Sequence, residues 1–192
     1  MDPILLPLAQ KILSKYVSFT QEELEPLLQR VKICTLKKND FFIDEGQIAR
    51  SIAFTLKGYL RVYYNHDGEE ITRDISPRRS FVTALPSFVS EKPSFEIIKA
   101  ITDCELLTIQ KKDLNFLYDN YPKWERFGRL IMEEMFVESQ HRVYSFITHT
   151  AEDRYRMLLK EHPDIIREVP LKYIADFIGI KLPSLSRLRK NI

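Results

Sequence analysis

Short runs rich in β-branched and aromatic residues fill the chain from about Val31 to Ile109, and they constrain the fold more than any other feature. The runs are FFIDEG, SIAFTLKGYLRVYYNHDGEEITRDI and FEIIKAITDCELLTI. Turn signals separate them, and Asp67-Gly68 predicts a two-residue hairpin because both turn positions need a positive φ. Many short strands at this spacing predict a small antiparallel roll or barrel.

Helices are predicted on both sides of this strand region. Residues 1–30 have a helical pattern, and TQEELEPLLQRV starts with Thr20 as N-cap and Glu23 as its capping-box partner. After the strands, KKDLNFLYDNYP predicts a short helix that ends before Pro122. A later helix, AEDRYRMLLKEH, is predicted to stop at Pro163, and DIIREVP to connect it to the last segment.

The segment from Lys123 to about Thr148 contains no proline and a single glycine. That predicts a helix of roughly 25 residues, or about 38 Å at 1.5 Å per residue. Because such a helix is longer than a small roll can cover, we expect its apolar stripe to pack on the same helix of a second copy. The alternative is packing inside its own chain. The stripe consists of Trp124, Phe127, Ile131, Met135, Val143, Phe146 and Ile147.

The composition excludes several classes of protein. Of the 192 residues, 44% are hydrophobic and 29% charged, as in a globular protein with one sizeable core and a smaller unit. The sequence has no apolar run of membrane-spanning length and no charged-then-apolar leader after Met1, so we expect a cytoplasmic protein without a membrane partner. Cys34 and Cys104 form no Cys-x-x-Cys pair, and we expect both to be reduced core cysteines.

The stretch LKYIADFIGIKLPSLSRLRK, from Leu171 to Lys190, has the residue pattern of a helix-turn-helix. Small Ala175 would lie where two short helices cross, and Gly179 would supply the positive φ of the turn. Five apolar residues would bury the inner faces of both helices: Ile174, Ile178, Ile180, Leu185 and Leu188. The second helix, from about Leu182 to Lys190, then keeps its outer face free for the major groove of DNA.

Positive charge is concentrated in this stretch, with five basic residues and only Asp176 as an acid from Leu171 onward. A guanidinium at Arg187, in the middle of the second helix, could reach guanine O6 and N7, while serines near the helix start suit base or phosphate contacts. The predicted DNA-binding set is Lys181, Ser184, Ser186, Arg187, Arg189 and Lys190. Two alternatives stay open: a helix pair that never touches DNA, and a module whose terminal helices bind a protein.

A roll, a long helix and a terminal helix-turn-helix in this order resemble the Crp/Fnr family, the regulators similar to the cyclic-AMP receptor protein. FFIDEGQIARSIAFTLKGYLRVYYNHDGEEIT resembles the family's first roll strands, and IADFIGIKLPSLSRLRK resembles its DNA-binding element. The placement of SLSR is similar to a branch of small regulators common in Bacteroidetes-type bacteria.

The resemblance implies an α+β fold in three parts. These are an antiparallel β-roll of the cyclic-nucleotide-binding type (a double-stranded β-helix) over 1–122, a dimerisation helix over 123–149 and a winged helix-turn-helix over 150–192. It also implies a cytoplasmic, bacterial transcription regulator, a homodimer that binds a pseudo-palindromic operator in double-stranded DNA, with RNA polymerase as a further candidate partner. An effector in the roll would reorient the DNA-binding units.

The sequence departs from the family where cyclic nucleotides bind. Members that bind them carry Gly-Glu-Leu and, about ten residues later, Arg-Ser/Thr-Ala; the Glu binds the ribose and the Arg binds the cyclic phosphate. Here Thr83 and Ala84 stand in place of Gly-Glu, and Ser94 and Phe95 in place of Arg-Ser. Because a buried phosphate would lack a charged partner, we expect no binding of cyclic AMP in the family manner.

The alternative is a nucleotide-responsive regulator in which Arg78, Arg79 or Lys92 replaces the missing arginine. The roll could otherwise sense another small molecule, or nothing, and no cofactor is expected. The residues predicted to line its effector pocket are Phe81, Thr83, Ala84, Leu85, Ser94 and Phe95.

Other sensing chemistries, and catalysis, lack the residues that they need. An iron–sulfur member of the family needs about four cysteines, and this chain has two. His66 lies at the predicted hairpin and His141, His149 and His162 lie on predicted helices, so we expect ordinary surface or helix-face side chains and no haem or metal ligand. A cupin-like metal enzyme would need clustered histidines and carboxylates on strands, and no glycine-rich catalytic or phosphate-binding motif occurs. We therefore expect no enzyme.

Overall fold

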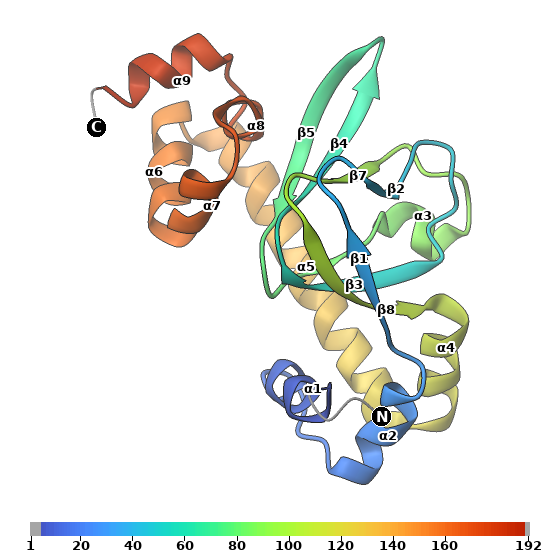
Figure 1. Cartoon of the computed structure of the whole chain (residues 1–192). Coiled ribbons are helices and arrows are strands. Elements are labelled where there is room, and N and C mark those ends of the chain that lie inside the picture. The colour runs from blue at the N-terminus through green and yellow to red at the C-terminus, as the bar shows by residue number, and fades with distance from the viewer. Residues whose placement is uncertain (1–4, 191–192) are drawn as a thin grey trace.

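A computed structural model describes residues 5–190 of the chain. The outer ends of the first and last predicted parts, residues 1–4 and 191–192, lie outside the described residues. Within residues 5–190, the chain runs from two N-terminal helices through the strands to a long helix and a group of short C-terminal helices (Figure 1).

The strands form two antiparallel sheets that close into a roll. One sheet has the order β1-β8-β3-β6 and the other β2-β7-β4-β5. Ala53 and Leu106 from the first sheet meet Val62 and Ile98 from the second in one buried core. The strands are β1 Lys32–Leu36, β2 Phe41–Ile43, β3 Ser51–Lys57, β4 Leu60–His66, β5 Glu69–Ser76, β6 Phe81–Val82, β7 Ile97–Ala100 and β8 Cys104–Gln110. The predicted antiparallel roll is confirmed.

The β4–β5 hairpin turns at Asp67 and Gly68, whose φ angles are 51° and 84°. Both are positive, as the predicted two-residue turn requires. The hairpin projects from the roll beside the C-terminal helices (Figure 1). Its pairing register shifts where Val62 faces Asp74 and Tyr63 faces Thr72, so Arg73 is the extra residue of a β-bulge on β5. A bulge leaves its extra residue unpaired and disrupts the ladder locally.

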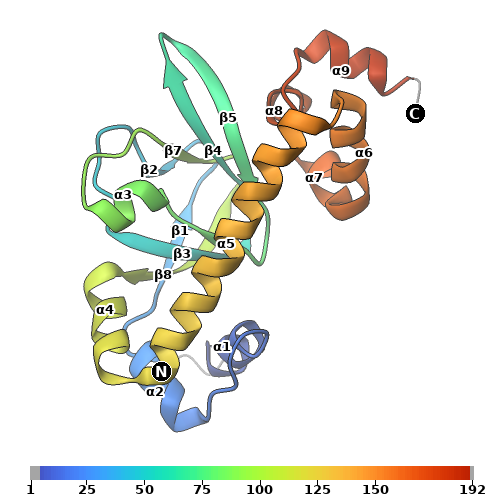
Figure 2. The same ribbon diagram turned by 180° about the vertical axis from the view of Figure 1, so that it is seen from behind.

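The helices that precede and follow the strands lie together at one end of the roll (Figure 2). The Thr20 hydroxyl accepts from the Glu23 N–H and the Glu23 carboxylate accepts from the Thr20 N–H, so the predicted capping box is formed. A short helix also separates β6 from β7. The helices are α1 Leu5–Leu13, α2 Gln21–Leu28, α3 Leu85–Ser90, α4 Lys111–Asn120 and α5 Pro122–Thr148.

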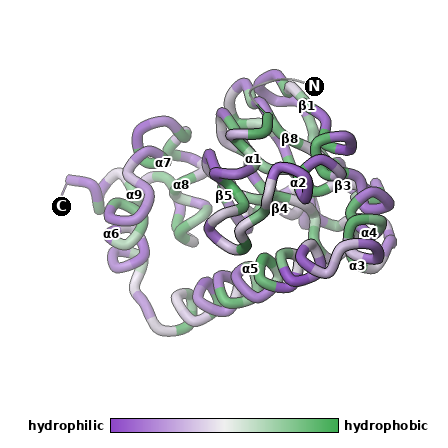
Figure 3. The backbone as a smooth tube through the Cα atoms, turned by 90° about the horizontal axis from the view of Figure 1, so that it is seen from below, coloured by the Kyte–Doolittle hydropathy of each residue, from purple (hydrophilic) through white to green (hydrophobic). Residues whose placement is uncertain are grey.

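Helix α5 has 27 residues, which makes it about 40 Å long at 1.5 Å per residue. Trp124, Phe127 and Ile131 in its first half are at most 6% exposed, and Phe19 stacks on Trp124 at 4.3 Å between ring centroids. The expectation that this half of the stripe packs on a second copy is therefore wrong, because the N-terminal segment already covers it. The second half exposes Phe136, Val137, Val143, Tyr144, Phe146 and Ile147. Figure 3 shows α5 along the edge of the molecule, with hydrophobic and hydrophilic residues alternating.

Four short helices follow α5: α6 Ala151–Glu161, α7 Pro163–Glu168, α8 Leu171–Phe177 and α9 Leu182–Leu188. Most of DIIREVP is helix α7 and not a plain connection, because Pro163 sits in the first helical turn, where its missing N–H costs no hydrogen bond. The described residues after α5 contain no strand, so the predicted winged form is wrong for this part of the chain. The segment between α6 and α8 contains helix α7 and no strand pair.

The C-terminal helices pack on the roll. Their core contains Tyr155, Leu158 and Ile174, and the roll contributes Tyr59 and Ile75 to the same cluster. The two parts therefore share buried apolar surface as well as the polar contacts described below.

Candidate nucleic-acid interface

The turn between α8 and α9 is a Schellman motif. Gly179 has φ +77°, the Gly179 N–H donates to the Asp176 carbonyl at 2.9 Å, and the Ile180 N–H donates to the Ala175 carbonyl at 2.9 Å. Glycine adopts this left-handed conformation without steric cost. A Cβ on Gly179 would also lie 2.7 Å from a ring carbon of Phe146 on α5, so the turn is seated directly on the long helix.

The predicted inner face of the two helices is the face that the structure buries. Ala175, at the crossing, is 1% exposed, and Leu185 of α9 is fully buried. Ile174 and Ile178 are buried as well, and Ile180 and Leu188 pack against the same cluster.

The outer face of α9 carries the predicted DNA contacts. Lys181, Ser186, Arg187, Arg189 and Lys190 are exposed, and Ser184 is half-buried. The Arg187 guanidinium donates to the Ser184 hydroxyl at 3.4 Å, a weak contact within the helix. This face therefore offers hydroxyls and cations to an anionic partner.

Lys181 differs from the other cations because it already has a partner. Its ammonium donates to the Glu69 carboxylate at the tip of the β4–β5 hairpin, with 2.7 Å between Nζ and Oε1. This hydrogen bond raises the pKa of Lys181. Both side chains are mostly exposed, so the pair contributes little to stability. A phosphate contact by Lys181 would require it to leave Glu69.

Two arginines join the end of α8 to the helices before it. Arg142 on α5 donates to the Phe177 carbonyl at 3.0 Å and lies over the Phe177 ring, 4.1 Å from its centroid. Arg154 on α6 donates to the Ile178 carbonyl at 2.9 Å. The last carbonyls of a helix carry partial negative charge, so cations stabilise them. Burial lowers the pKa of Arg142 to about 10, which leaves it charged at neutral pH.

Asp176 joins α8 to the roll. Its carboxylate accepts from the Thr72 N–H at 2.6 Å, from the Thr72 hydroxyl, and from Arg61 Nη2 at 3.1 Å. Thr72 lies on β5 next to Arg73, the extra residue of the bulge, where the ladder is locally disrupted and the Thr72 N–H makes this contact. Arg61 is 3% exposed, donates to the Thr72 hydroxyl at 2.7 Å and pairs with Glu70. The buried guanidinium thus has charged or polar partners from both parts of the chain.

A second polar contact lies at the other end of the same interface. The Tyr59 hydroxyl donates to the Asp164 carboxylate on α7 at 2.9 Å, and Arg78 pairs with Glu168 at 2.7 Å. Arg78 was one of the possible substitutes for the missing nucleotide-binding arginine, and here it is engaged with the C-terminal helices.

The residues predicted to line an effector pocket do not share one surface. Phe81 and Leu85 line an apolar cavity on the helix side of the roll. Thr83 is buried and donates to the Ser51 carbonyl at 2.9 Å, and Ala84 is fully buried just before α3.

Ser94 and Phe95 lie at the opposite end of that segment. The buried Ser94 hydroxyl donates to the Glu96 carbonyl at 2.8 Å, which closes the local turn. Phe95 is 56% exposed and stacks on Tyr64 at 5.9 Å between ring centroids.

A buried acid lies beside Ser94, and the arginine next to it, Arg73, is already paired with that acid. Glu96 is 3% exposed, its Oε1 lies 2.8 Å from Arg73 Nε, and its Oε2 has no hydrogen-bond partner among residues 5–190. Burial raises the pKa of Glu96 in spite of the attraction of Arg73. A carboxyl group in this place repels a phosphate when ionised, so the residues do not fit a cyclic nucleotide held in the family manner.

Residues 5–190 contain no group of three histidine, cysteine or carboxylate side chains placed to hold a metal ion. Cys34 is half-buried and Cys104 buried, and both are free thiols. In the part of the chain that the structure describes, no helix is both long and apolar enough to cross a bilayer.

Sequence reasoning did not find the polar network that joins the two parts. Its members include Arg61, Thr72 and Arg142. A signal existed, because Arg61 in GYLRVYY is a single charge in an apolar strand run. A charge in such a place is buried only with a partner.

Residues 33–121 match the family model described as cyclic nucleotide-binding domain. A transcriptional regulator of the crp/fnr family from Eubacterium rectale superposes with a TM-score of 0.68 at 14% identity, covering 90% of this chain and 83% of that chain. The chain has the Crp/Fnr fold. FixK2 from Bradyrhizobium japonicum has a TM-score of 0.72 at 16% identity and covers 84% of this chain and 83% of its own.

A third Crp/Fnr-type structure is CLP from Xanthomonas campestris, described as a c-di-GMP-responsive global regulator. It has a TM-score of 0.69 at 14% identity and covers 90% of this chain and 91% of its own. No curated protein matches the sequence. The resemblance inferred from the sequence is confirmed at the level of fold.

Proposed function

We propose that this protein is a dimeric transcription regulator that binds a specific sequence of double-stranded DNA through α9. The observation that carries the proposal is the α8–α9 pair, which buries Leu185 and crosses at Ala175 while α9 presents Arg187 on a free outer face. A short helix of this kind fits the major groove, where a guanidinium reads guanine.

The residues of the outer face then have distinct roles. Arg187 reads a base, Ser184 and Ser186 contact bases or phosphates, and Arg189 and Lys190 contact phosphates. Lys181 reaches a phosphate after it releases Glu69. The same proposal makes the protein a cytoplasmic regulator without catalytic activity.

The second half of α5 supports the homodimer. Large apolar side chains there are exposed, among them Phe136 at 65% and Ile147 at 77%. A second copy of α5 would cover them, so residues 123–149 serve as the dimerisation helix between the roll and the DNA-binding part. Two copies of α9 related by a two-fold axis would read half-sites about one helical turn (~34 Å) apart, which is a pseudo-palindromic operator.

The effector of the roll is proposed not to be cyclic AMP. The support is the buried Glu96 beside Ser94 and the engagement of Arg78 with Glu168. The second candidate is a nucleotide-responsive regulator that uses a substitute for the missing phosphate-binding arginine. With Arg78 engaged, Arg79 and Lys92 remain as possible substitutes. Calorimetric titration with cyclic AMP checks this point, and micromolar or tighter binding would contradict the proposal.

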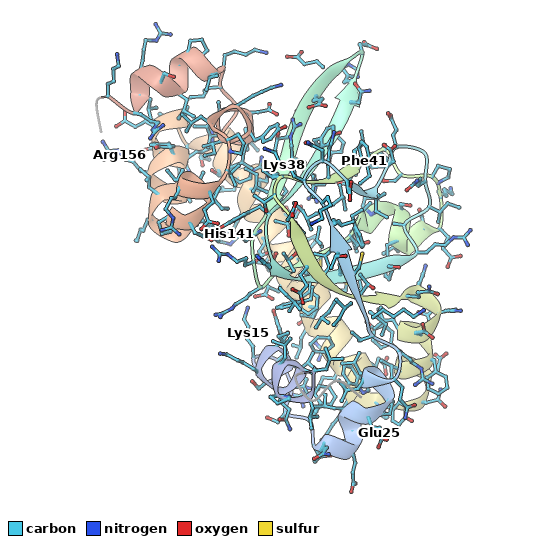
Figure 4. The ribbon with its side chains drawn as sticks, in the orientation of Figure 1. Lys15, Glu25, Lys38, Phe41, His141 and Arg156 are labelled. Carbon is cyan, nitrogen blue, oxygen red and sulfur yellow. The ribbon has the colours of Figure 1, made fainter. Side chains whose placement is uncertain are left out.

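The main experiment is selection of bound sequences from a random duplex library by the wild type, Arg187→Ala and Arg156→Ala. Arg156 is the matched control because it is also an exposed arginine, pairs with Glu152 on its own helix, and lies on the side of α6 away from the roll (Figure 4). We expect an inverted repeat whose preference at one position of each half-site is relaxed by Arg187→Ala, at about 1–3 kcal/mol of discrimination, and unchanged by Arg156→Ala.

Salt dependence separates this proposal from a protein-binding module. DNA affinity should fall steeply with the logarithm of salt concentration, because phosphate contacts release counterions. Absence of any enriched sequence at low salt, together with no salt-dependent affinity for duplex DNA, would contradict DNA binding and favour a protein partner for the terminal helices.

A further inference from the structure

An apolar cavity of about 120 Å³ lies where the first sheet of the roll meets the flanking helices. Strands β3, β6 and β8 form one wall. Helices α1, α4 and α5 form most of the others, and a single residue of α2 and two of α3 also line the cavity. Phe54 and Phe81 line it from the sheet, and Trp124 and Phe127 line it from α5. The cavity is therefore bounded by the long helix as well as by the roll.

This cavity overlaps only in part with the predicted effector pocket. Of the residues predicted to line an effector pocket, Phe81 and Leu85 border the cavity. Thr83, Ser94 and Phe95 do not border it. A molecule bound in the cavity would thus touch the first half of α5 and the helix-facing side of the sheet.

The polar atoms on the cavity walls determine what it can hold. Three lining side chains carry nitrogen or oxygen, and two of these are satisfied elsewhere: Thr108 donates to the Lys32 carbonyl at 3.2 Å, and the Trp124 indole donates to the Glu23 carbonyl at 3.2 Å. The third is Tyr118. Its hydroxyl forms no hydrogen bond with residues 5–190 and lies against Gly128 of α5, where a Cβ would overlap it.

A cavity of this composition does not suit water. A buried water needs two to four polar partners, whereas apolar cavities of comparable size, such as one of about 150 Å³ lined by Leu, Ile and Phe, stay dry and bind benzene or xenon. The Tyr118 hydroxyl is not fully buried, so water can reach it in the free protein. A single acceptor atom on an otherwise apolar molecule would take the place of that water.

We propose that the cavity is a binding site for a small, largely apolar molecule, about one aromatic ring in size, that accepts one hydrogen bond from the Tyr118 hydroxyl. Burial raises the pKa of Tyr118 to about 12, so the hydroxyl is a neutral donor at every pH at which the protein would be studied. The site needs no bound DNA, so its test and the test of the proposed function fail independently.

Trp124 provides the readout. It is the only tryptophan of the chain, it is 1% exposed and it borders the cavity. The full-length protein is titrated with toluene, which has no acceptor, and with anisole, which has one ether oxygen, and Trp124 fluorescence is recorded. We expect saturable changes with both probes and at least tenfold tighter binding of anisole.

Two variants and a matched control make the test specific. Tyr118→Phe should bring the affinity for anisole to that for toluene, because only the acceptor contact is lost. Ala9→Leu adds three carbon atoms on the α1 wall, and it should weaken both probes at least tenfold without lowering the melting temperature. Ala151→Leu makes the same change at the start of α6, away from the cavity, and should alter neither affinity.

Each outcome decides a part of the proposal. No saturable change with either probe would overturn the site. Equal affinity of the wild type for the two probes, or an anisole preference that survives Tyr118→Phe, would overturn the role of Tyr118. A lowered melting temperature for Ala9→Leu with unchanged probe binding would show that the wall has no space to fill and that the probes bind elsewhere.

Discussion

Asp176→Asn should loosen the DNA-binding helices from the roll. The substitution keeps the shape of the side chain and one oxygen, but it removes the negative charge that faces Arg61 at 3.1 Å. Arg61 and both Thr72 groups donate to the same oxygen, Oδ2, so all three contacts change from a charged to a neutral acceptor. The change is confined to the contact between α8 and β5, because the α8–α9 turn uses the backbone of Asp176 and not its side chain.

The magnitude follows from the environment of the pair. Hydrogen bonds to charged groups contribute about 1.5–3 kcal/mol each when buried. The Asp176 side chain is 31% exposed, and the Arg61 side chain, 4% exposed, keeps Glu70 and Thr72 as partners. We therefore expect a loss of about 2 kcal/mol in the free energy that holds the docked arrangement.

Hydrogen exchange at the Thr72 amide measures this loss directly, because its N–H donates to the Asp176 carboxylate. A loss of about 2 kcal/mol corresponds to roughly 30-fold faster exchange if opening of the contact limits exchange. Asp67→Asn at the hairpin tip is the control, since the Asp67 side chain is 95% exposed and Asn also adopts its φ of 51°. A double-mutant cycle with Thr72→Val should give a coupling energy above about 0.5 kcal/mol.

Two results would refute this reasoning. If Asp176→Asn and Asp67→Asn leave Thr72 exchange equally slow, the carboxylate does not hold α8 to the roll in solution. If the cycle is additive, Asp176 and Thr72 act independently, and the loss would have another cause.

Three further changes test other parts of the structure. Gly179→Ala should lower the melting temperature by several degrees more than Gly46→Ala. Both glycines have φ +77°, but only at Gly179 would a Cβ meet an aromatic ring. Equal decreases in melting temperature would contradict the close approach of Phe146 to Gly179. Burial holds the pKa of Glu96 above its unfolded value of 4.5, so its contribution to stability is complete below that pH and is lost as the pH rises through the folded pKa. In urea unfolding, Glu96→Gln should therefore have a higher free energy of unfolding than the wild type at pH 7 and lose this advantage below pH 4.5. A difference in free energy of unfolding that stays constant with pH would contradict the burial argument. Ile147→Asp should convert a dimer to a monomer in sedimentation experiments, whereas Ile71→Asp, at an isoleucine that is also exposed but lies on β5, should not. A monomeric wild type would contradict dimerisation through α5.

Local signals in the sequence predicted most elements of the fold. The capping box at Thr20, the Asp67-Gly68 turn and the proline-free run after Pro122 each depend on interactions within a few residues, and each appears as predicted. The helix-turn-helix is of the same kind, because Ala175 and Gly179 act through the geometry of a local crossing. The DNA-binding roles of its outer residues stay a prediction.

Long-range packing decided what these signals could not. The apolar stripe of α5 is continuous in sequence, yet α1 and the segment after it cover Trp124 while Ile147 stays 77% exposed. The contact of Asp176 with Thr72 joins positions 104 residues apart, and the pKa of Glu96 is raised by its burial in the folded roll. Periodicity shows that a face is apolar but not what covers it, and it gives no partner to a lone charge, because both depend on which segments the closed roll brings together.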